Sequence, residues 1–480
     1  MDPLRQLSAL DAQFLAFETD TNVANVAGLS ILEGPISREE LLGLVEERSE
    51  LVPPLRQRIM RVPFNLDHPY WVQDDTLDLD YHVRELALPA PGSDRQLAAQ
   101  VARLHARRLD RRHPLWEMYL IHGLKGGRTA LYTKLHHAAI DGMGGADVLA
   151  AFMDLEPNPR PRPRPAPAEP ELAPETAQML LRTAARLAAN PAHLLRFLAE
   201  AAPYLDEIPL ISRIPGAGTV SRVTRRLARE LGISDGQVVP ELPKLVVPRT
   251  PFNGPVSAHR RFAFVELPLD EVKKVKNAFG VTVNDVVMTL AATAVRRWLI
   301  AHDALPEDPL VAGVPFSLRG VEGTEPGNQV TLMITSLDTH IDDPRERLFA
   351  VRDSMQRIKD RFSLSPARWL RHLSESMPAA LTGLAERAAF GLAAQTSPPV
   401  NLLISNVPGP QIPLYICGRR LLAQYPVSVV TDASGGLNIT ALSYNGQVAI
   451  GIIADRTMVP DIWKLPTHLR ESLDELMSLT

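Results

Sequence analysis

The alternation of apolar and polar positions predicts strands at several places along the chain. Residues 128–134 alternate between the two kinds of side chain, and residues 330–337, which read VTLMITSL, are rich in strand-forming residues. Residues 438–455 contain two apolar runs separated by Asn445 and Gly446. Because an Asn-Gly pair readily takes the two left-handed positions of a type I′ turn, this range is predicted to form a β-hairpin.

Helix starts are marked by capping residues. Ser8, Ser37 and Thr282 are each followed three residues later by an acidic residue, which is typical of a capping box at the first turn of a helix. Helices and strands therefore alternate in both halves of the chain. This pattern predicts an α/β fold with mixed sheets.

A proline-rich stretch divides the chain. Residues 156–174 read EPNPRPRPRPAPAEPELAP, where closely spaced prolines favour an extended conformation and prevent a packed core. Residues 175–232 then read as helices, and the α/β character resumes near Val256. We therefore predict an N-terminal domain, a proline-rich and helical linker, and a C-terminal domain, at residues 1–155, 156–250 and 251–480.

Composition narrows the class of protein. The 480 residues carry a net charge of -4, and 45% are hydrophobic while 22% are charged, which argues against whole-chain disorder and against a multi-span membrane protein. No basic excess is available to neutralise phosphates, so a nucleic-acid partner is not expected. The single cysteine, Cys417, has no partner for an intramolecular disulfide. This fits a reducing compartment and predicts a cytoplasmic protein.

Two segments bear on export and membrane insertion. Residues 1–10 lack the basic run and apolar core of a secretory signal. Residues 388–418 carry no charge and are long enough to span a bilayer, but they contain five prolines, which cannot continue a helix. We expect a protein that is soluble or attached to a membrane surface.

One motif stands out as a candidate for chemistry. Residues 136–142 read HHAAIDG and follow directly on the strand predicted at 128–134. The end of a strand leading into a loop is a common place for catalytic groups. Because adjacent strand residues point to opposite faces, only one of His136 and His137 can face a given cleft.

Three interpretations of this motif remain open from the residues alone. A metal site is disfavoured because no cysteine or HExxH helix accompanies the histidines, so no metal is expected. The pair could satisfy buried backbone groups at the strand end. Alternatively, a neutral histidine is the usual general base for a hydroxyl, with Asp141 holding the loop or orienting the ring.

The motif carries a resemblance to a known family. HHxxxDG is the hallmark of the chloramphenicol-acetyltransferase-like, CoA-dependent acyltransferases, and residues 114–142 resemble the bacterial wax ester synthase/diacylglycerol acyltransferase branch nearly throughout. Further stretches resemble blocks of that family at residues 7–18, 282–288, 314–320 with 327–330, 405–410 and 454–461. The chain departs from the family at residues 22–28, NVANVAG, where a Met-His pair is usual. From the resemblance, this difference is expected to alter the wall of the acyl or acceptor pocket and with it the acceptor preference.

The resemblance implies two chloramphenicol-acetyltransferase-like domains with a site in the tunnel between them. It implies transfer of a fatty acyl group from acyl-CoA to the hydroxyl of diacylglycerol, or of a long-chain alcohol to give a wax ester. His137, the second histidine of the motif, would be the base, and no covalent enzyme intermediate is needed. Acyl-CoA is the co-substrate, and no other cofactor is implied.

Further site residues follow from the same resemblance. His136, Asp141 and Gly142 complete the motif, with Asp141 paired to an arginine for which Arg56 is the candidate. Gly142 would permit close backbone packing at the turn.

A second group of candidates lies in the C-terminal half. Asn284 is the candidate donor to the oxyanion, next to Asp285, although both also fit capping positions of a helix. Other residues either shape the cleft or form a turn that ends a strand, namely Ser405, Asn406, Pro408 and Gly409.

The helical segment at residues 175–232 is locally basic and interleaves arginines with apolar residues. It is interpreted either as a surface helix that binds a membrane or lipid droplet, or as a linker helix that packs on the protein. Two other functions stay open: a lipid-binding protein without activity, and an acyltransferase acting on carrier-protein thioesters.

Overall fold

The computed structural model describes residues 5–140, 145–159, 174–185, 219, 222–223, 226, 246–317, 330–364 and 399–480. Most of the predicted linker at 156–250 lies outside these residues, as does most of the helical segment 175–232. Within the linker, residues 176–185 are helical.

The N-terminal half is built on a six-stranded sheet in which β4 and β5 are parallel and the other neighbours are antiparallel. In sheet order its strands are β11 (Tyr415–Ile416), β12 (Arg419–Val427), β1 (Asn25–Leu32), β6 (Thr129–His136), β5 (Trp116–His122) and β4 (Val83–Ala87). Its helices are α1 (Ala9–Phe17), α2 (Arg38–Arg48), α3 (Leu79–His82), α4 (Asp94–His105) and α5 (Gly145–Ala151). A separate hairpin pairs β2 (Gln57–Met60) with β3 (Tyr70–Gln73). Short 3-10 turns occur at Ser49–Leu51 (η1), Pro53–Leu55 (η2), Pro63–Asn65 (η3) and His137–Ile140 (η4).

The C-terminal half holds the second six-stranded sheet, which is mixed because β10 runs parallel to both of its neighbours. In sheet order its strands are β7 (Arg260–Pro268), β14 (Gln447–Asp455), β13 (Leu437–Tyr444), β10 (Leu402–Val407), β8 (Val311–Ser317) and β9 (Val330–Ser336). Its helices are α8 (Leu269–Phe279), α9 (Val283–Ile300), α10 (Pro344–Leu364) and α13 (Lys464–Ser478). The largest apolar core lies between these helices and the sheet, with α9 almost wholly buried.

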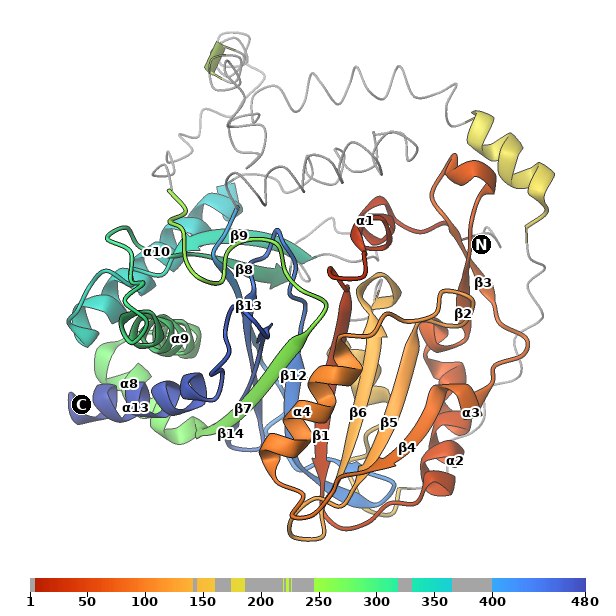
Figure 1. Cartoon of the computed structure of the whole chain (residues 1–480), viewed down its shortest axis with the longest axis horizontal. Coiled ribbons are helices and arrows are strands. Elements are labelled where there is room, and N and C mark those ends of the chain that lie inside the picture. The colour runs from red at the N-terminus through yellow and green to blue at the C-terminus, as the bar shows by residue number, and fades with distance from the viewer. Residues whose placement is uncertain are drawn as a thin grey trace.

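The C-terminal half contributes strands to the N-terminal sheet, and the two halves share a core. Tyr425 of β12 pairs with Leu29 of β1, so the predicted C-terminal range contributes two strands to the N-terminal sheet. Figure 1 shows β12 between the two halves. A methyl group on Gly451 of β14 would collide with the carbonyl oxygen of Pro426 of β12, which shows how closely the two sheets approach. No signal in the sequence separates β12 from its neighbours, because strand patterning does not name the partner strand.

The predicted mixed α/β fold is confirmed, and so are the individual elements on which it was based. The ranges predicted as strands at 128–134 and 330–337 correspond to β6 and β9. Asn445 and Gly446 both have positive φ, 44° and 83°, as a type I′ turn requires between β13 and β14. Complete capping boxes occur at Ser37 and Thr282.

Among the described residues, no single helix is long and apolar enough to cross a membrane. The pair α8 and α9 passes the test of length and composition together, but the two helices are bent by 103° at the break between them.

Candidate active site

The histidine pair lies where β6 ends and the η4 turn begins. Hydrogen bonds on both sides hold this strand end: His136 N–H donates to the Leu115 carbonyl at 3.0 Å, and His137 N–H donates to the Ala24 carbonyl at 2.8 Å. Asn25, the first residue of β1, pairs with His136 in the sheet. The backbone of both histidines is therefore held by two neighbouring strand segments.

His136 points into the protein. His136 is 1% exposed, and its Nδ1 accepts a hydrogen bond from the Ala138 N–H at 3.1 Å. Its Nε2 lies 3.5 Å from Oε1 of Glu18, which follows α1. His136 thus links the strand end, the η4 turn and the C-terminus of α1.

His137 points to a different neighbour. Its imidazole stacks on the ring of Phe14 in α1, with the centroids 3.9 Å apart and an angle of 22° between the planes. Figure 1 shows α1 lying across this end of the N-terminal sheet. Nδ1 of His137 is buried and has no hydrogen-bond partner among the described residues. The structure therefore separates the environments of the two histidines, as the strand geometry predicts.

The electrostatic environment keeps the His137 imidazole neutral. Burial, together with the smaller effect of the neighbouring His136, lowers the pKa of His137 to about 4. Because this pKa lies well below 7, the imidazole is uncharged at neutral pH, and one ring nitrogen has a lone pair that can accept a proton. A neutral imidazole is the form that a general base needs.

Glu18 is a fully buried carboxylate that sequence reasoning did not single out. Its side chain is 0% exposed and accepts a hydrogen bond from Nη2 of Arg111 at 2.8 Å. Burial raises the pKa of Glu18, but His136 and Arg111 outweigh it and hold the pKa at about 2. Glu18 and Phe14 both lie inside the N-terminal block at residues 7–18, but their link to the histidines exists only in the folded chain.

Asn284 and Asn406 come together from two elements of the C-terminal half. Nδ2 of Asn406, at the end of β10, donates to Oδ1 of Asn284, at the start of α9, at 3.3 Å. This bond uses the oxygen of Asn284 and leaves its amide hydrogens for another acceptor. Among the described residues, no hydrogen bond or ring contact joins this pair to His137.

Asp285 acts as a capping residue in the structure. Its carboxylate accepts the Thr282 N–H at 2.9 Å, and Thr282 Oγ1 accepts the Asp285 N–H at 3.2 Å. Asp285 is 3% exposed. These two hydrogen bonds support the interpretation of Asp285 as a helix-capping residue.

The SNVPGP segment continues from β10 alongside β13. Ser405 pairs with Thr440 in the parallel register, and the Gly409 N–H donates to Oγ of Ser443 at 3.2 Å. A methyl group on Gly409 would collide with the Ser443 carbonyl oxygen. Glycine is required at this position by backbone packing, with Pro408 directly before it.

The other predicted residues are only partly described. Asp141 and Gly142 lie outside the described residues. Arg56 forms an ion pair with Glu50 at 3.1 Å, and its Nε is buried without a hydrogen bond among the described residues. The predicted pairing of Arg56 with Asp141 therefore stays a prediction.

The segment that departs from the family, residues 22–28, holds the start of β1 in place. Nδ2 of Asn25 donates to the carbonyls of His105 and Arg107, at 2.9 and 2.8 Å. Asn22 exchanges two hydrogen bonds with Asp432 from the C-terminal half, at 3.0 and 2.8 Å. Both asparagines bind neighbouring chain segments near the histidine pair.

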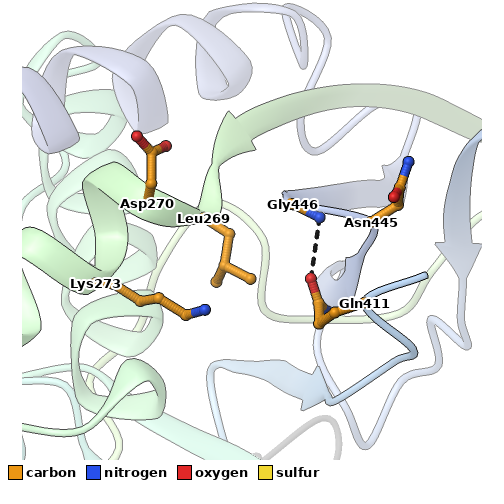
Figure 2. A pocket seen from close by; sticks show the side chains of 6 residues that line it. All are labelled: Leu269, Asp270, Lys273, Gln411, Asn445 and Gly446. Atoms are coloured by element: carbon orange, nitrogen blue, oxygen red, sulfur yellow. Dashed lines mark hydrogen bonds between the residues drawn. The ribbon is translucent and has the colours of Figure 1, made fainter. Parts of the chain in front are cut away.

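A surface pocket lies elsewhere, where α8 begins beside the β13–β14 turn (Figure 2). Gln411 closes one side by accepting the Gly446 N–H at 3.0 Å. None of the predicted site residues that the structure describes lines this pocket. Among the described residues, no group of three or more His, Cys, Asp or Glu could hold a metal ion.

Comparison with known proteins decides the family. A family model for the "Wax ester synthase/diacylglycerol acyltransferase catalytic domain" matches residues 7–287, and one for the "WS/DGAT C-terminal domain" matches residues 326–477. The chain belongs to the wax ester synthase/diacylglycerol acyltransferase family. The resemblance predicted from the HHxxxDG motif and its flanking blocks is confirmed.

Relatives extend over nearly the whole length of this family member. A putative diacylglycerol O-acyltransferase of Mycobacterium tuberculosis (strain ATCC 25618 / H37Rv) is 36% identical over 479 residues, 98% of this chain and 99% of that protein. The O-acyltransferase WSD of Acinetobacter baylyi is 31% identical over 480 residues, 98% of this chain and 96% of that protein. The chain is therefore an acyltransferase.

Solved structures agree on the fold. The wax ester synthase/diacylglycerol acyltransferase from Marinobacter aquaeolei VT8 is 29% identical, with a TM-score of 0.65 and 98% of each chain covered. A condensation domain of the calcium-dependent antibiotic synthetase is similar in fold alone, with a TM-score of 0.54, 14% identity, and 99% of this chain and 96% of that chain covered.

Proposed function

We propose that this acyltransferase moves a fatty acyl group from acyl-CoA to the hydroxyl of diacylglycerol, giving triacylglycerol. The names of the mycobacterial relatives support diacylglycerol as the acceptor. The observation that carries the chemistry is the neutral imidazole of His137 at the end of β6, stacked on Phe14. Acyl-CoA is the co-substrate, and the reaction as written needs no other cofactor.

In the proposed mechanism, His137 takes the proton from the acceptor hydroxyl as its oxygen attacks the thioester carbonyl carbon. The tetrahedral intermediate then collapses with cleavage of the C–S bond. The imidazolium of His137 returns its proton to the departing thiolate, so the products are an ester and free CoA thiol. Direct transfer needs no enzyme nucleophile, which fits a chain whose one thiol, Cys417, has a pKa raised by burial to about 11.

Asn284 is the proposed donor to the developing oxyanion. The hydrogen bond from Asn406 fixes the orientation of its amide, with the oxygen turned toward Asn406 and the hydrogens available for a substrate. Asp285 supports this placement by capping α9.

A wax ester synthase is the second candidate, because the Marinobacter relative carries that name and its fold matches along the whole chain. The acceptor would then be a long-chain alcohol. The protein machinery would be the same, since both acceptors present a hydroxyl to His137.

The test uses purified protein with palmitoyl-CoA and either diolein or hexadecanol, following free thiol release and lipid products. His137→Ala is expected to lower thiol release by at least about 100-fold, because a general base contributes that much. His122→Ala is the matched control, since His122 pairs with Glu85 at the surface, away from η4. Equal rates for wild type and His137→Ala would contradict the base assignment, and transfer to hexadecanol alone would favour the wax ester reaction. Transfer to neither acceptor would point to lipid binding without activity or to a carrier-protein thioester as donor.

We further propose that the enzyme works at a cytoplasmic lipid surface. The structure of the tip of the β2–β3 hairpin supports this proposal. Phe64 at this tip is 90% exposed, and it and Asn65 both have positive φ, 59° and 52°. A positive φ is uncommon for a bulky residue, and at this exposure the ring of Phe64 makes no compensating buried contact with the described residues. Residues 51–66 contain three arginines and no acidic residue, as anionic headgroups would favour.

The described helix at 176–185 stands next to this hairpin tip. Met179 is buried with Val62 and Tyr70, while Leu181 is 72% exposed. The remainder of the basic segment 175–232 is almost entirely outside the described residues. Exposed apolar groups from the hairpin and from the start of that segment thus support one docking surface.

A further inference from the structure

We propose that Glu18 is a positioning residue for acyl transfer: its carboxylate sets the tautomer of His136 and, through the η4 turn, the placement of His137. The inference rests on the proposed role of His137 as base, because it explains how that imidazole is held. Glu18 itself need not touch either substrate.

The charge on Glu18 is secured from the side opposite His136. Oε2 accepts from Nη2 of Arg111 at 2.8 Å and lies 3.3 Å from Nε of Arg108. His136 and the Arg111 guanidinium hold the pKa of the fully buried Glu18 carboxyl far below its usual range, against the effect of burial. Glu18 is therefore an anion, and its other oxygen, Oε1, can only accept a hydrogen bond.

The hydrogen bonding of His136 assigns its tautomer. Nδ1 accepts the Ala138 N–H, so Nδ1 must carry a lone pair and the ring proton must sit on Nε2. Nε2 faces Glu18 Oε1 at 3.5 Å. Both atoms are buried, and neither has a hydrogen-bond partner among the described residues. The Nε2–H of His136 can donate and the Oε1 of Glu18 can accept, so the two atoms complement each other. A movement of a few tenths of an ångström brings them to hydrogen-bond distance.

The tautomer of His136 matters because its hydrogen-bond partner, Ala138, is part of the η4 turn that carries His137. The η4 turn runs from His137 to Ile140, so the Ala138 N–H next to His137 is one of the groups that fix this turn. With the proton on Nδ1, two N–H donors would face each other and the anchor of the turn would be lost. The anion at Glu18 favours the tautomer that keeps the anchor.

A purely structural role for Glu18 makes a different prediction. Arg111 also donates from Nη2 to the Leu15 carbonyl of α1 at 2.7 Å, so the Glu18–Arg111 pair ties α1 to the segment after α4. If that were the whole role, replacing Glu18 would lower stability without changing the state of His136.

The experiment compares Glu18→Gln, which removes the charge at nearly constant shape, with Asp20→Asn. Asp20 also pairs with an arginine of this group, Arg108 at 3.1 Å, but its side chain is 93% exposed, so it is the matched control. The readouts are nitrogen NMR of histidine-labelled protein, with His136 assigned by difference from His136→Gln, and kcat and KM with palmitoyl-CoA and diolein. We expect wild type and Asp20→Asn to show His136 protonated on Nε2. In Glu18→Gln we expect a tautomer mixture and a kcat reduced by up to about 100-fold at nearly unchanged KM, as a small misplacement of a catalytic group produces.

An unchanged His136 tautomer in Glu18→Gln would overturn the proposal, and so would an unchanged kcat. Glu18→Asp is the second variant should Glu18→Gln not fold, because it keeps the anion beside Arg111 but withdraws it from His136 by one methylene. The same NMR shift and loss of kcat are expected. Retained activity in His137→Ala would instead remove the proposed function, while the NMR readout would still decide the relation between Glu18 and His136.

Discussion

The ring of Phe14 lies nearly parallel to the imidazole of His137, with the two centroids 3.9 Å apart. This contact joins α1 to the η4 turn and covers one face of the proposed base. Burial is also the main reason that the pKa of His137 falls to about 4. One contact from the N-terminal helix thus influences both the position of the imidazole and its protonation state.

The first prediction concerns the pH dependence of the reaction. His137 must be neutral to accept a proton. Its titration is therefore expected to leave kcat/KM unchanged above about pH 5.5 and to lower kcat/KM tenfold per pH unit below about pH 4. Phe14→Ala exposes the imidazole and should move this acid limb toward 6.5, while Phe14→Leu keeps the ring covered and should leave the limb nearly in place. The pH profile of thiol release measures both. Identical limbs in wild type and Phe14→Ala would show that α1 does not set this pKa.

The second prediction concerns the Asn284–Asn406 pair. Asn284→Ala is expected to lower kcat by about 100- to 1000-fold with little change in KM, because one oxyanion donor contributes that much to the transition state alone. Asn406→Ala should have a smaller effect of the same kind, since Asn406 acts by orienting Asn284. Steady-state kinetics with both acceptors provide the measurement. A rise in KM without loss of kcat would assign the pair to substrate binding instead.

The third prediction separates capping from chemistry at the neighbouring residues. Thr282→Ala removes the side chain that accepts the Asp285 N–H, and it should lower the free energy of unfolding by about 1 kcal/mol. Its kcat should stay within about twofold of wild type once folded, because among the described residues no side-chain hydrogen bond links Thr282 to the histidine pair or to Asn284. Denaturant unfolding and the transferase assay, run on the same preparation, test the two parts.

The fourth prediction concerns stability at acid pH. His82 and His105 are buried and neutral, and burial lowers their pKa values to about 4 and about 3. Below pH 6.5 the unfolded chain takes up protons that these folded histidines do not, so stability falls as pH drops from 6.5 toward 4. The melting temperature should decrease on the order of 5–10 °C over that interval.

His105→Gln provides the control for this acid effect. His105 bonds Tyr132 Oη through Nδ1 and the Ser428 carbonyl through Nε2, and glutamine can bond both without titrating. Its melting temperature should therefore depend less steeply on pH. An equal slope in both proteins would place the acid sensitivity elsewhere.

The fifth prediction tests the close approach of the two sheets. Gly451→Ala should destabilise the protein by at least about 2 kcal/mol, because the added methyl group meets the rigid backbone oxygen of Pro426. Gly43→Ala in α2 meets nothing within 4 Å and should stabilise by about 0.5–1 kcal/mol through helix propensity. Denaturant unfolding measures both changes in the free energy of unfolding. Opposite signs for the two Gly→Ala substitutions would confirm that local packing determines the effect on stability.

A sixth measurement addresses the lipid surface. Phe64→Ser should reduce flotation with anionic liposomes while leaving thiol release with a dispersed acceptor unchanged, because Phe64 is exposed and lies outside the histidine site. Leu422→Ser is the matched control, because Leu422 is also an exposed apolar residue but lies in β12, away from the hairpin tip. Equal flotation of wild type and Phe64→Ser would exclude the hairpin tip as the anchor.

The sequence by itself determined the local elements, the family and the candidates for the chemistry-bearing residues. The strand pattern identified β6 and β9, Asn445-Gly446 identified the hairpin turn, and a seven-residue motif made His137 the candidate base. These features depend on neighbours in the chain, or on a pattern of residue types that can be recognised without coordinates. Only the tertiary structure decided that β12 from the C-terminal half completes the N-terminal sheet, and that Glu18 and Phe14 face His136 and His137. Those contacts join residues far apart in sequence, and the periodicity of a strand or helix specifies which face is buried but not what is buried against it.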